Sequence, residues 1–141
     1  MLLLPLLLLA LAPAPAPTPV DVLRDWDEQR ALAWSTADPA ALRGLYTPGS
    51  AAGRRDLAML DRWRARGLRV EGIRMQLLEV DTRRRTPDRL VLDVTDRLTG
   101  ATAAPGRLTL PRDRPSRHVV TMVRVAGEWR VRSVLSATRR G

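Results

Sequence analysis

The sequence contains no cysteine, lysine, asparagine or phenylalanine and only one isoleucine. Without cysteine the chain can form no disulfide, thiolate metal site, thiol nucleophile or lipoprotein anchor. A single histidine, His118, cannot build a typical zinc site or a cysteine–histidine pair. The sequence also contains no hydrolase elbow and no glycine-rich loop for phosphate or dinucleotide binding. We therefore expect neither a metal nor a cofactor.

The composition that remains is that of a globular protein. Hydrophobic residues make up 45% and charged residues 28% of the chain, values too apolar for disorder and too charged for a membrane bundle. All 24 basic residues are arginines, against 15 carboxylates, which gives a formal net charge of +9. The missing residue types have AT-rich codons and the abundant ones have GC-rich codons, which indicates a GC-rich genome. Composition alone does not reveal the function.

An apolar run occupies residues 2–12 and is typical of the hydrophobic core of a signal peptide. It is shorter than the roughly 20 residues that span a bilayer. Two interpretations stay open, a secreted protein and one tethered by an uncleaved N-terminal anchor, and both predict an extracytoplasmic location. No arginine precedes the run, and proline follows each small-residue cleavage pattern, which weakens the case for cleavage. We divide the chain into segment 1–12, an Ala/Pro-rich linker at 13–19, one domain at 20–137 and a basic tail at 138–141.

Three helices are predicted at the start of the domain. From residue 20 the apolar side chains recur with a helical period that places Asp27 and Trp34 on one stripe, with Trp26 and Arg30 beside it. Asp38 is positioned to cap a short second helix that begins with proline. A third helix is expected over about residues 51–66, with Gly67 as its left-handed stop.

The rest of the domain alternates apolar and polar residues, which predicts strands. In the first strand the alternation slips at Gly72-Ile73 and again at Leu77-Leu78, as in a bulged and strongly curved strand. Residues 83–88 are expected to form the following turn. The later strands are predicted at residues 90–99, 108–110, 119–125 and 129–135. Helices followed by antiparallel strands indicate an α+β domain with a curved sheet wrapped around a helix.

Several short phrases resemble the nuclear transport factor 2-like superfamily, a cystatin-like α+β group that includes SnoaL-like cyclases and ketosteroid isomerase. They are Trp26-Asp27, Ala33-Trp34, Asp38-Pro39, Leu45-Tyr46, Arg66-Gly67-Leu68 and the terminal GEWRV strand. The likeness covers roughly residues 20–136 and is greatest to uncharacterised exported actinobacterial members. It implies a cone with a pocket between the first helix and the concave sheet, where many members bind or transform a hydrophobic small molecule. These phrases specify a fold rather than a reaction.

Asp96 is the best candidate for chemistry because it shares one face of its strand with Leu90, Leu92, Val94 and Leu98. A carboxylate in an apolar pocket could act as a general acid or base with a raised pKa. The alternatives are an ion pair with Arg30 or another inward arginine, or a strand that has reached the rim of the sheet. The abundance of arginine favours the ion pair.

Other pocket candidates each have a plainer alternative. Asp27 is a second pocket carboxylate, or it pairs with Arg30 or caps a backbone group. Tyr46 donates its hydroxyl to a ligand, or it is simply packed. His118 opens a strand beside Arg117, which favours a surface position. The four tryptophans line a ligand cavity or, without phenylalanine, fill the core, and the core is favoured. The predicted pocket set is Trp26, Asp27, Arg30, Trp34, Tyr46, Trp63 and Asp96.

The resemblance gives little support for catalysis. A ketosteroid isomerase site needs a tyrosine on the first helix, which has none here, and a SnoaL-like or scytalone dehydratase-like site needs a histidine near acids. We therefore favour an exported non-catalytic domain that binds a small hydrophobic ligand or serves as an envelope accessory module. The alternatives are a cofactor-free isomerase, cyclase or dehydratase that uses Asp96, and a structural or partner-binding protein with a basic surface.

Two surfaces could bind partners. Arg83, Arg84 and Arg85 could meet an anionic membrane or a cell-wall polymer, or they could form a solvated turn. Nucleic acid is not expected as a partner of an exported chain. Homodimers through the outer face of the sheet are also expected from the resemblance. Apolar area for that contact would come from Val91, Val120 and Val134.

Overall fold

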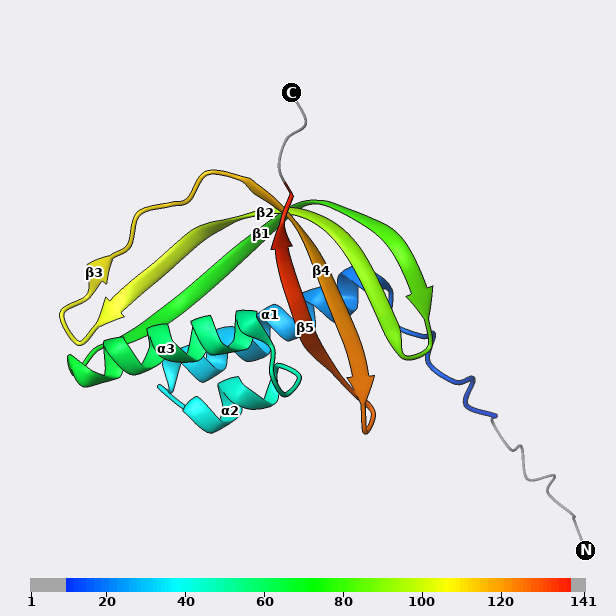
Figure 1. Cartoon of the computed structure of the whole chain (residues 1–141), viewed down its shortest axis with the longest axis horizontal. Coiled ribbons are helices and arrows are strands. Elements are labelled where there is room, and N and C mark those ends of the chain that lie inside the picture. Colours follow the sequence, from blue (N-terminus) through cyan, green and yellow to red (C-terminus); the bar gives the residue numbers. More distant parts are fainter. Residues whose placement is uncertain (1–9, 138–141) are drawn as a thin grey trace, which may run out of the picture.

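The computed structural model describes residues 10–137 and places three helices on one side of a bent antiparallel sheet (Figure 1). This confirms the predicted α+β class. The helices come first along the chain and the strands follow. Their bounds are α1 Pro19–Ser35, α2 Pro39–Gly44, α3 Ala51–Ala65, β1 Arg69–Thr86, β2 Arg89–Ala104, β3 Leu108–Thr109, β4 Ser116–Val125 and β5 Glu128–Ser136.

Each helix begins at a residue whose side chain accepts a backbone hydrogen bond. Thr18 accepts from the amide of Asp21, and the Asp21 carboxylate accepts from the amide of Thr18 in return. Asp38 caps α2 as predicted, and Ser50 caps α3. After α3 the chain turns at Gly67, whose φ of 69° confirms the predicted left-handed stop.

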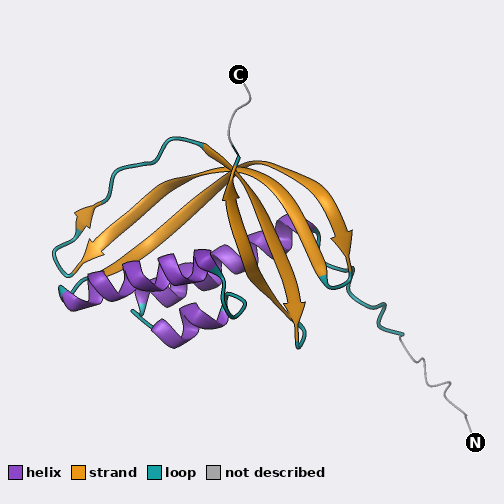
Figure 2. Ribbon diagram, in the orientation of Figure 1, coloured by secondary structure: helices purple, strands orange, loops and turns teal. Residues whose placement is uncertain are grey.

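The sheet has the strand order β1-β2-β4-β5, with β3 paired to β2. Its long strands arch over the helices (Figure 2). The pairing of β1 with β2 shifts between Glu71 and Arg74 and again between Leu77 and Glu79, at both predicted bulge positions. Because a bulge bends its strand and increases the local twist, these shifts give the sheet a concave face that receives α1.

The core lies between the helices and this concave face. Its fully buried side chains are Leu42, Leu60, Leu92, Met122, Val94 and Val131. The prediction that Val120 and Val134 lie on the outer face is wrong. Val120 pairs directly with Leu92 and also with Val134, and directly opposed residues share a face, so all three point inward.

The predicted turn at residues 83–88 is also wrong, because β1 continues through Thr86 and the turn is confined to Pro87 and Asp88. Asp93 of β2 supplies a reason for the longer strand. Its carboxylate accepts hydrogen bonds from Arg83 and Arg117, with closest distances of 2.7 Å to each. Hydrogen bonds from Arg117 and then Arg83 hold the pKa of Asp93 below its usual value. Arg83 is thus part of an ion pair on the outer face.

Two predicted terminal segments fall wholly or partly outside the described residues. They are the apolar segment, of which residues 1–9 are not described, and the basic tail at 138–141. Residues 10–18 have no regular secondary structure. Within residues 10–137, no helix is both long and apolar enough to span a membrane.

The contact of α3 with Tyr46 gives a test of the packing. A Cβ atom added at Gly53 would lie 2.8 Å from Cβ and Cγ of Tyr46, whereas one added at Gly44 would meet nothing within 4 Å. We expect Gly53→Ala to lower the free energy of unfolding by about 1–2 kcal/mol because overpacking outweighs the gain in helix propensity. Urea denaturation measures the effect. Gly44→Ala is the control, and equal stability of the two variants would contradict the packing described here.

Candidate functional site

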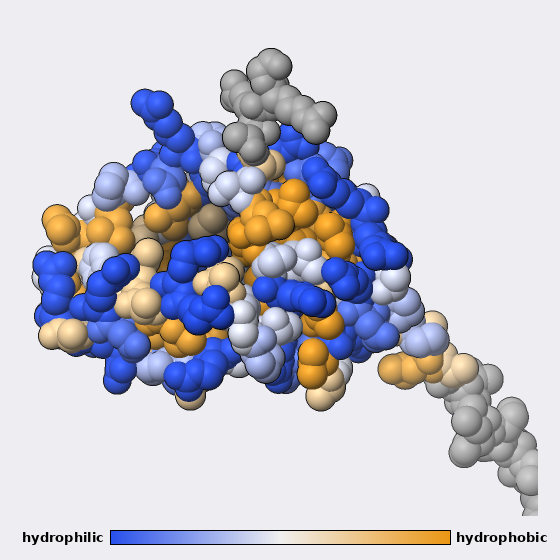
Figure 3. Space-filling model, viewed as in Figure 1, coloured by the Kyte–Doolittle hydropathy of each residue, from blue (hydrophilic) through white to orange (hydrophobic). Residues whose placement is uncertain are grey.

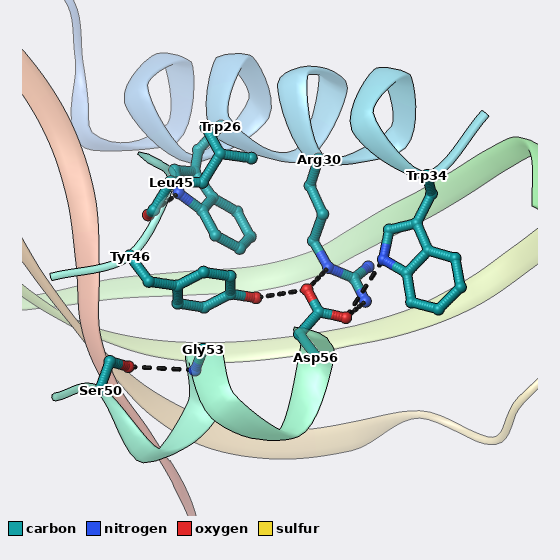
Figure 4. Close-up of polar contacts among 8 residues, drawn as sticks. All are labelled: Trp26, Arg30, Trp34, Leu45, Tyr46, Ser50, Gly53 and Asp56. Carbon is teal, nitrogen blue, oxygen red and sulfur yellow. Dashed lines mark hydrogen bonds and ion pairs between the residues drawn. The ribbon is translucent and has the colours of Figure 1, made fainter. Parts of the chain in front are cut away.

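A buried carboxylate on α3 joins the three helical segments. Asp56, 7% exposed, accepts hydrogen bonds from Nε and Nη2 of Arg30 at 2.7 Å each, from the Tyr46 hydroxyl at 2.6 Å and from Trp34 Nε1 at 3.2 Å (Figure 4). Burial acts to raise the pKa of Asp56, but the bonds and charge of Arg30 outweigh it and hold that pKa below its usual value. The carboxylate therefore stays ionised beside its guanidinium partner.

This arrangement differs from the prediction for Arg30. The expected ion pair of Arg30 with Asp96 is not formed, and both carboxylate oxygens that Arg30 contacts belong to Asp56. Sequence reasoning missed Asp56. The signal that could have found it is its position four residues before Leu60, one turn along the apolar stripe of α3.

A cavity of about 430 Å³ lies between α1, α3 and the concave face of the sheet, and we call it the site cavity. The predicted residues that line it are Trp26, Asp27, Arg30, Tyr46 and Asp96. Trp34 and Trp63 are not among its lining residues. Trp34 is buried against Asp56, and Trp63 packs on the edge of the core.

Asp96 and His118 meet at the wall of the site cavity. Asp96 is 8% exposed, and its Oδ2 lies 3.3 Å from Nε2 of His118. The predicted surface position of His118 is wrong, because β4 pairs His118 with the buried Val94 and so turns the imidazole to the concave face. The alternation of His118 with Val120 and Met122 was the sequence signal for this orientation. The hydrogen bond to Asp96 raises the pKa of His118 against the opposing effect of burial.

Asp27 lines the same cavity from α1. Burial and then the charge of Asp96 raise its pKa to about 7, while Arg30 and His118 act in the opposite direction. A carboxyl group that titrates near neutrality can both accept and release a proton under physiological conditions. Asp27 and His118, both with raised pKa values, thus line one cavity, with Asp96 in contact with His118.

The same three groups do not form a metal site. Among residues 10–137, no group of three or more His, Asp or Glu side chains lies close enough together to hold a metal ion.

The fold is that of the nuclear transport factor 2-like and SnoaL-like proteins. No protein-family model matches the sequence, and no curated protein does. Solved structures do: Aln2 from a Streptomyces species is 14% identical with a TM-score of 0.58, over 86% of this chain and 92% of its own. A nuclear transport factor 2-like protein from Cytophaga hutchinsonii is 16% identical with a TM-score of 0.54, over 86% and 100%. A protein of unknown function from Mycobacterium tuberculosis is 14% identical with a TM-score of 0.55, over 86% and 77%.

Removal of the Asp56 charge tests the role of this buried carboxylate. Asp56→Asn would leave the half-buried Arg30 without its ion partner and weaken the bonds from Tyr46 and Trp34, and we expect a loss of about 3 kcal/mol in the free energy of unfolding. Asp61→Asn removes a carboxylate from the same helix at an exposed position, where its contact with Arg64 is 3.6 Å, so it should cost less than about 1 kcal/mol. Chemical denaturation distinguishes the two variants, and similar losses would refute the anchoring role of Asp56.

The raised pKa of Asp27 predicts a pH dependence of stability. The folded state keeps this proton up to about pH 7, whereas the ordinary pKa of the carboxyl group is 3.8, so the stability of the fold falls as the pH rises between these values. The raised pKa of His118 also stabilises the fold at low pH, and this contribution is lost as the pH rises through that pKa.

We therefore expect higher stability near about pH 5 than near about pH 8, with Asp27→Asn recovering on the order of 2 kcal/mol at the higher pH. Urea midpoints measured across this range provide the comparison. Asp25→Asn, at an exposed position of α1, serves as the control and should keep the wild-type pH dependence. If Asp27→Asn keeps it too, the raised pKa is wrong.

Proposed function

We propose that the domain binds a small, mainly apolar molecule with a carbonyl group in the site cavity and moves a proton on it without a cofactor. The observation that carries the proposal is the pairing of buried Asp96 with His118 rather than with an arginine, beside an Asp27 whose pKa is raised to about 7. An arginine partner would have occupied the Asp96 carboxylate, whereas its contact with His118 places an orienting carboxylate beside a group that can donate a proton.

The walls of the site cavity suit a ligand of this kind. Its volume of about 430 Å³ falls within the about 300–1,000 Å³ typical of small-molecule pockets. Apolar side chains line most of it, including Leu23, Met59 and Val120, with Trp26 as an aromatic wall. Apolar walls with a few polar groups bind the body of a ligand by burial and fix its orientation by hydrogen bonds.

The chemistry follows from the different states of the two proton carriers. Ionised Asp27 removes a proton from the carbon next to the ligand carbonyl, and protonated His118 donates its proton to the oxygen of the enolate that forms. Asp96 stabilises the imidazolium and fixes the orientation of the ring. In a ligand with a carbon–carbon double bond one carbon further from the carbonyl, the intermediate is a dienol. Asp27 then returns the proton to the far carbon of that double bond, the double bond moves next to the carbonyl, and the enol proton returns to His118, so that no proton is gained or lost.

Binding without chemistry is the second candidate function. It is favoured by the donors around the site cavity, because several of them already bond to the protein. The Tyr46 hydroxyl donates to Asp56, and Trp26 Nε1 donates to the carbonyl oxygen of Leu45 at 2.8 Å. Few donors then remain to hold a reacting carbonyl.

Deuterium exchange tests the proposal with a probe that needs no knowledge of the natural substrate. We expect the wild-type protein to accelerate incorporation of deuterium next to the carbonyl of 2-tetralone in D₂O, as followed by proton NMR. Asp27→Asn should lose about 100-fold or more of this acceleration because it removes the base, and Asp25→Asn should retain it. Binding of 2-tetralone without accelerated exchange would favour the second candidate, and exchange unaffected by Asp27→Asn would rule out the proposed base.

A further inference from the structure

A second cavity, of about 480 Å³, lies between α2, the start of α3 and β5, and we call it the basic pocket. Its basic lining residues are Arg43, Arg54 and Arg130. Tyr46 lines both this pocket and the site cavity, so its ring forms part of the wall between them. Hydrophilic side chains cover much of the face on which α2 and β5 lie (Figure 3).

The positive charges of the three arginines are not neutralised by acidic residues of the basic pocket. No Asp or Glu occurs among the described residues that line it, and none of the three arginines forms an ion pair with another described residue. Arg54 donates to the carbonyl oxygen of Gly49 at 2.7 Å. Nε of Arg130 is buried and has no hydrogen-bond partner among residues 10–137. The positive charges of Arg43, Arg54 and Arg130 therefore have no counter-charge among the described residues, which favours a bound anion.

Main-chain hydrogen bonds bring together the three segments that carry these arginines. Val131 donates its amide to the carbonyl oxygen of Leu45, and its own carbonyl accepts from the amide of Thr47. These two bonds dock the segment between α2 and α3 against β5. Arg130 precedes Val131 on β5, Arg43 lies near the end of α2, and Arg54 lies in the first turns of α3. The presence of all three arginines around one pocket therefore follows from main-chain contacts.

We propose that the basic pocket binds the phosphate group of a small organic phosphate. A carboxylate has two oxygens, too few to accept hydrogen bonds from three guanidinium groups at once. A phosphate dianion has three terminal oxygens and can accept hydrogen bonds from all three groups. Ala40, Pro48 and Leu57 add apolar surface to the lining, which suits the organic part of such a molecule. This site is separate from the proposed proton transfer and does not depend on it.

Titration calorimetry of the full chain with phenyl phosphate tests the proposal at low salt. We expect saturable binding that Arg130→Gln and Arg43→Gln each weaken roughly tenfold, the effect of a lost charged hydrogen bond. Arg43 is exposed, so its variant decides the matter if Arg130→Gln does not fold. Arg62→Gln, which removes an equal charge from an exposed position of α3 outside the pocket, should bind as the wild type does.

Phosphatidic acid vesicles, whose lipid ends in a phosphate monoester like that of phenyl phosphate, distinguish a free phosphate from a lipid headgroup. If vesicle binding falls in Arg130→Gln together with phenyl phosphate binding, the pocket accepts the headgroup as well, and the proposal stands. No binding of phenyl phosphate by the wild type would overturn it. Equal weakening by Arg62→Gln would also overturn it, since binding would then reflect the net charge of the surface.

Discussion

The buried carboxylate of Asp56 is the interaction on which the rest of the structure depends. It accepts from Arg30 of α1, from Tyr46 after α2 and from Trp34, while it is itself part of α3. It therefore fixes the helices to one another beneath the sheet. In the neighbouring site cavity, burial and the charge of Asp96 raise the pKa of Asp27 to about 7, although the charges of Arg30 and His118 act to lower it.

The local parts of the fold could be predicted from the sequence because their causes are local. Asp38 caps a helix through its own side chain, Gly67 takes a φ that other residues avoid, and a slip in alternation at Gly72 marks a bulge. The end of β1 could not be read in the same way. Arg83 extends the strand by pairing with Asp93 on the neighbouring strand, and such a contact depends on the strand register.

In the candidate site too, local features could be predicted from the sequence and long-range contacts could not. The alternation in β2 was enough to place Asp96 on an apolar face, but not to identify its partner. His118 reaches it only because β4 pairs in a register that sets His118 beside Val94, and Arg30 turns instead to Asp56, which lies 26 residues away. A surplus of arginine made an arginine partner for Asp96 the reasonable expectation, but the geometry of the helices directs that arginine elsewhere.

The central claim is that Asp56 holds Arg30 in an ion pair while Asp27, in the adjacent site cavity, titrates near neutrality. Carbon-detected NMR of the aspartate carboxyl groups as a function of pH tests it most directly. The account predicts that Asp27 titrates near pH 7 and that the pKa of Asp56 lies below the ordinary value of an aspartate. Titration of Asp27 near its ordinary value would contradict the account.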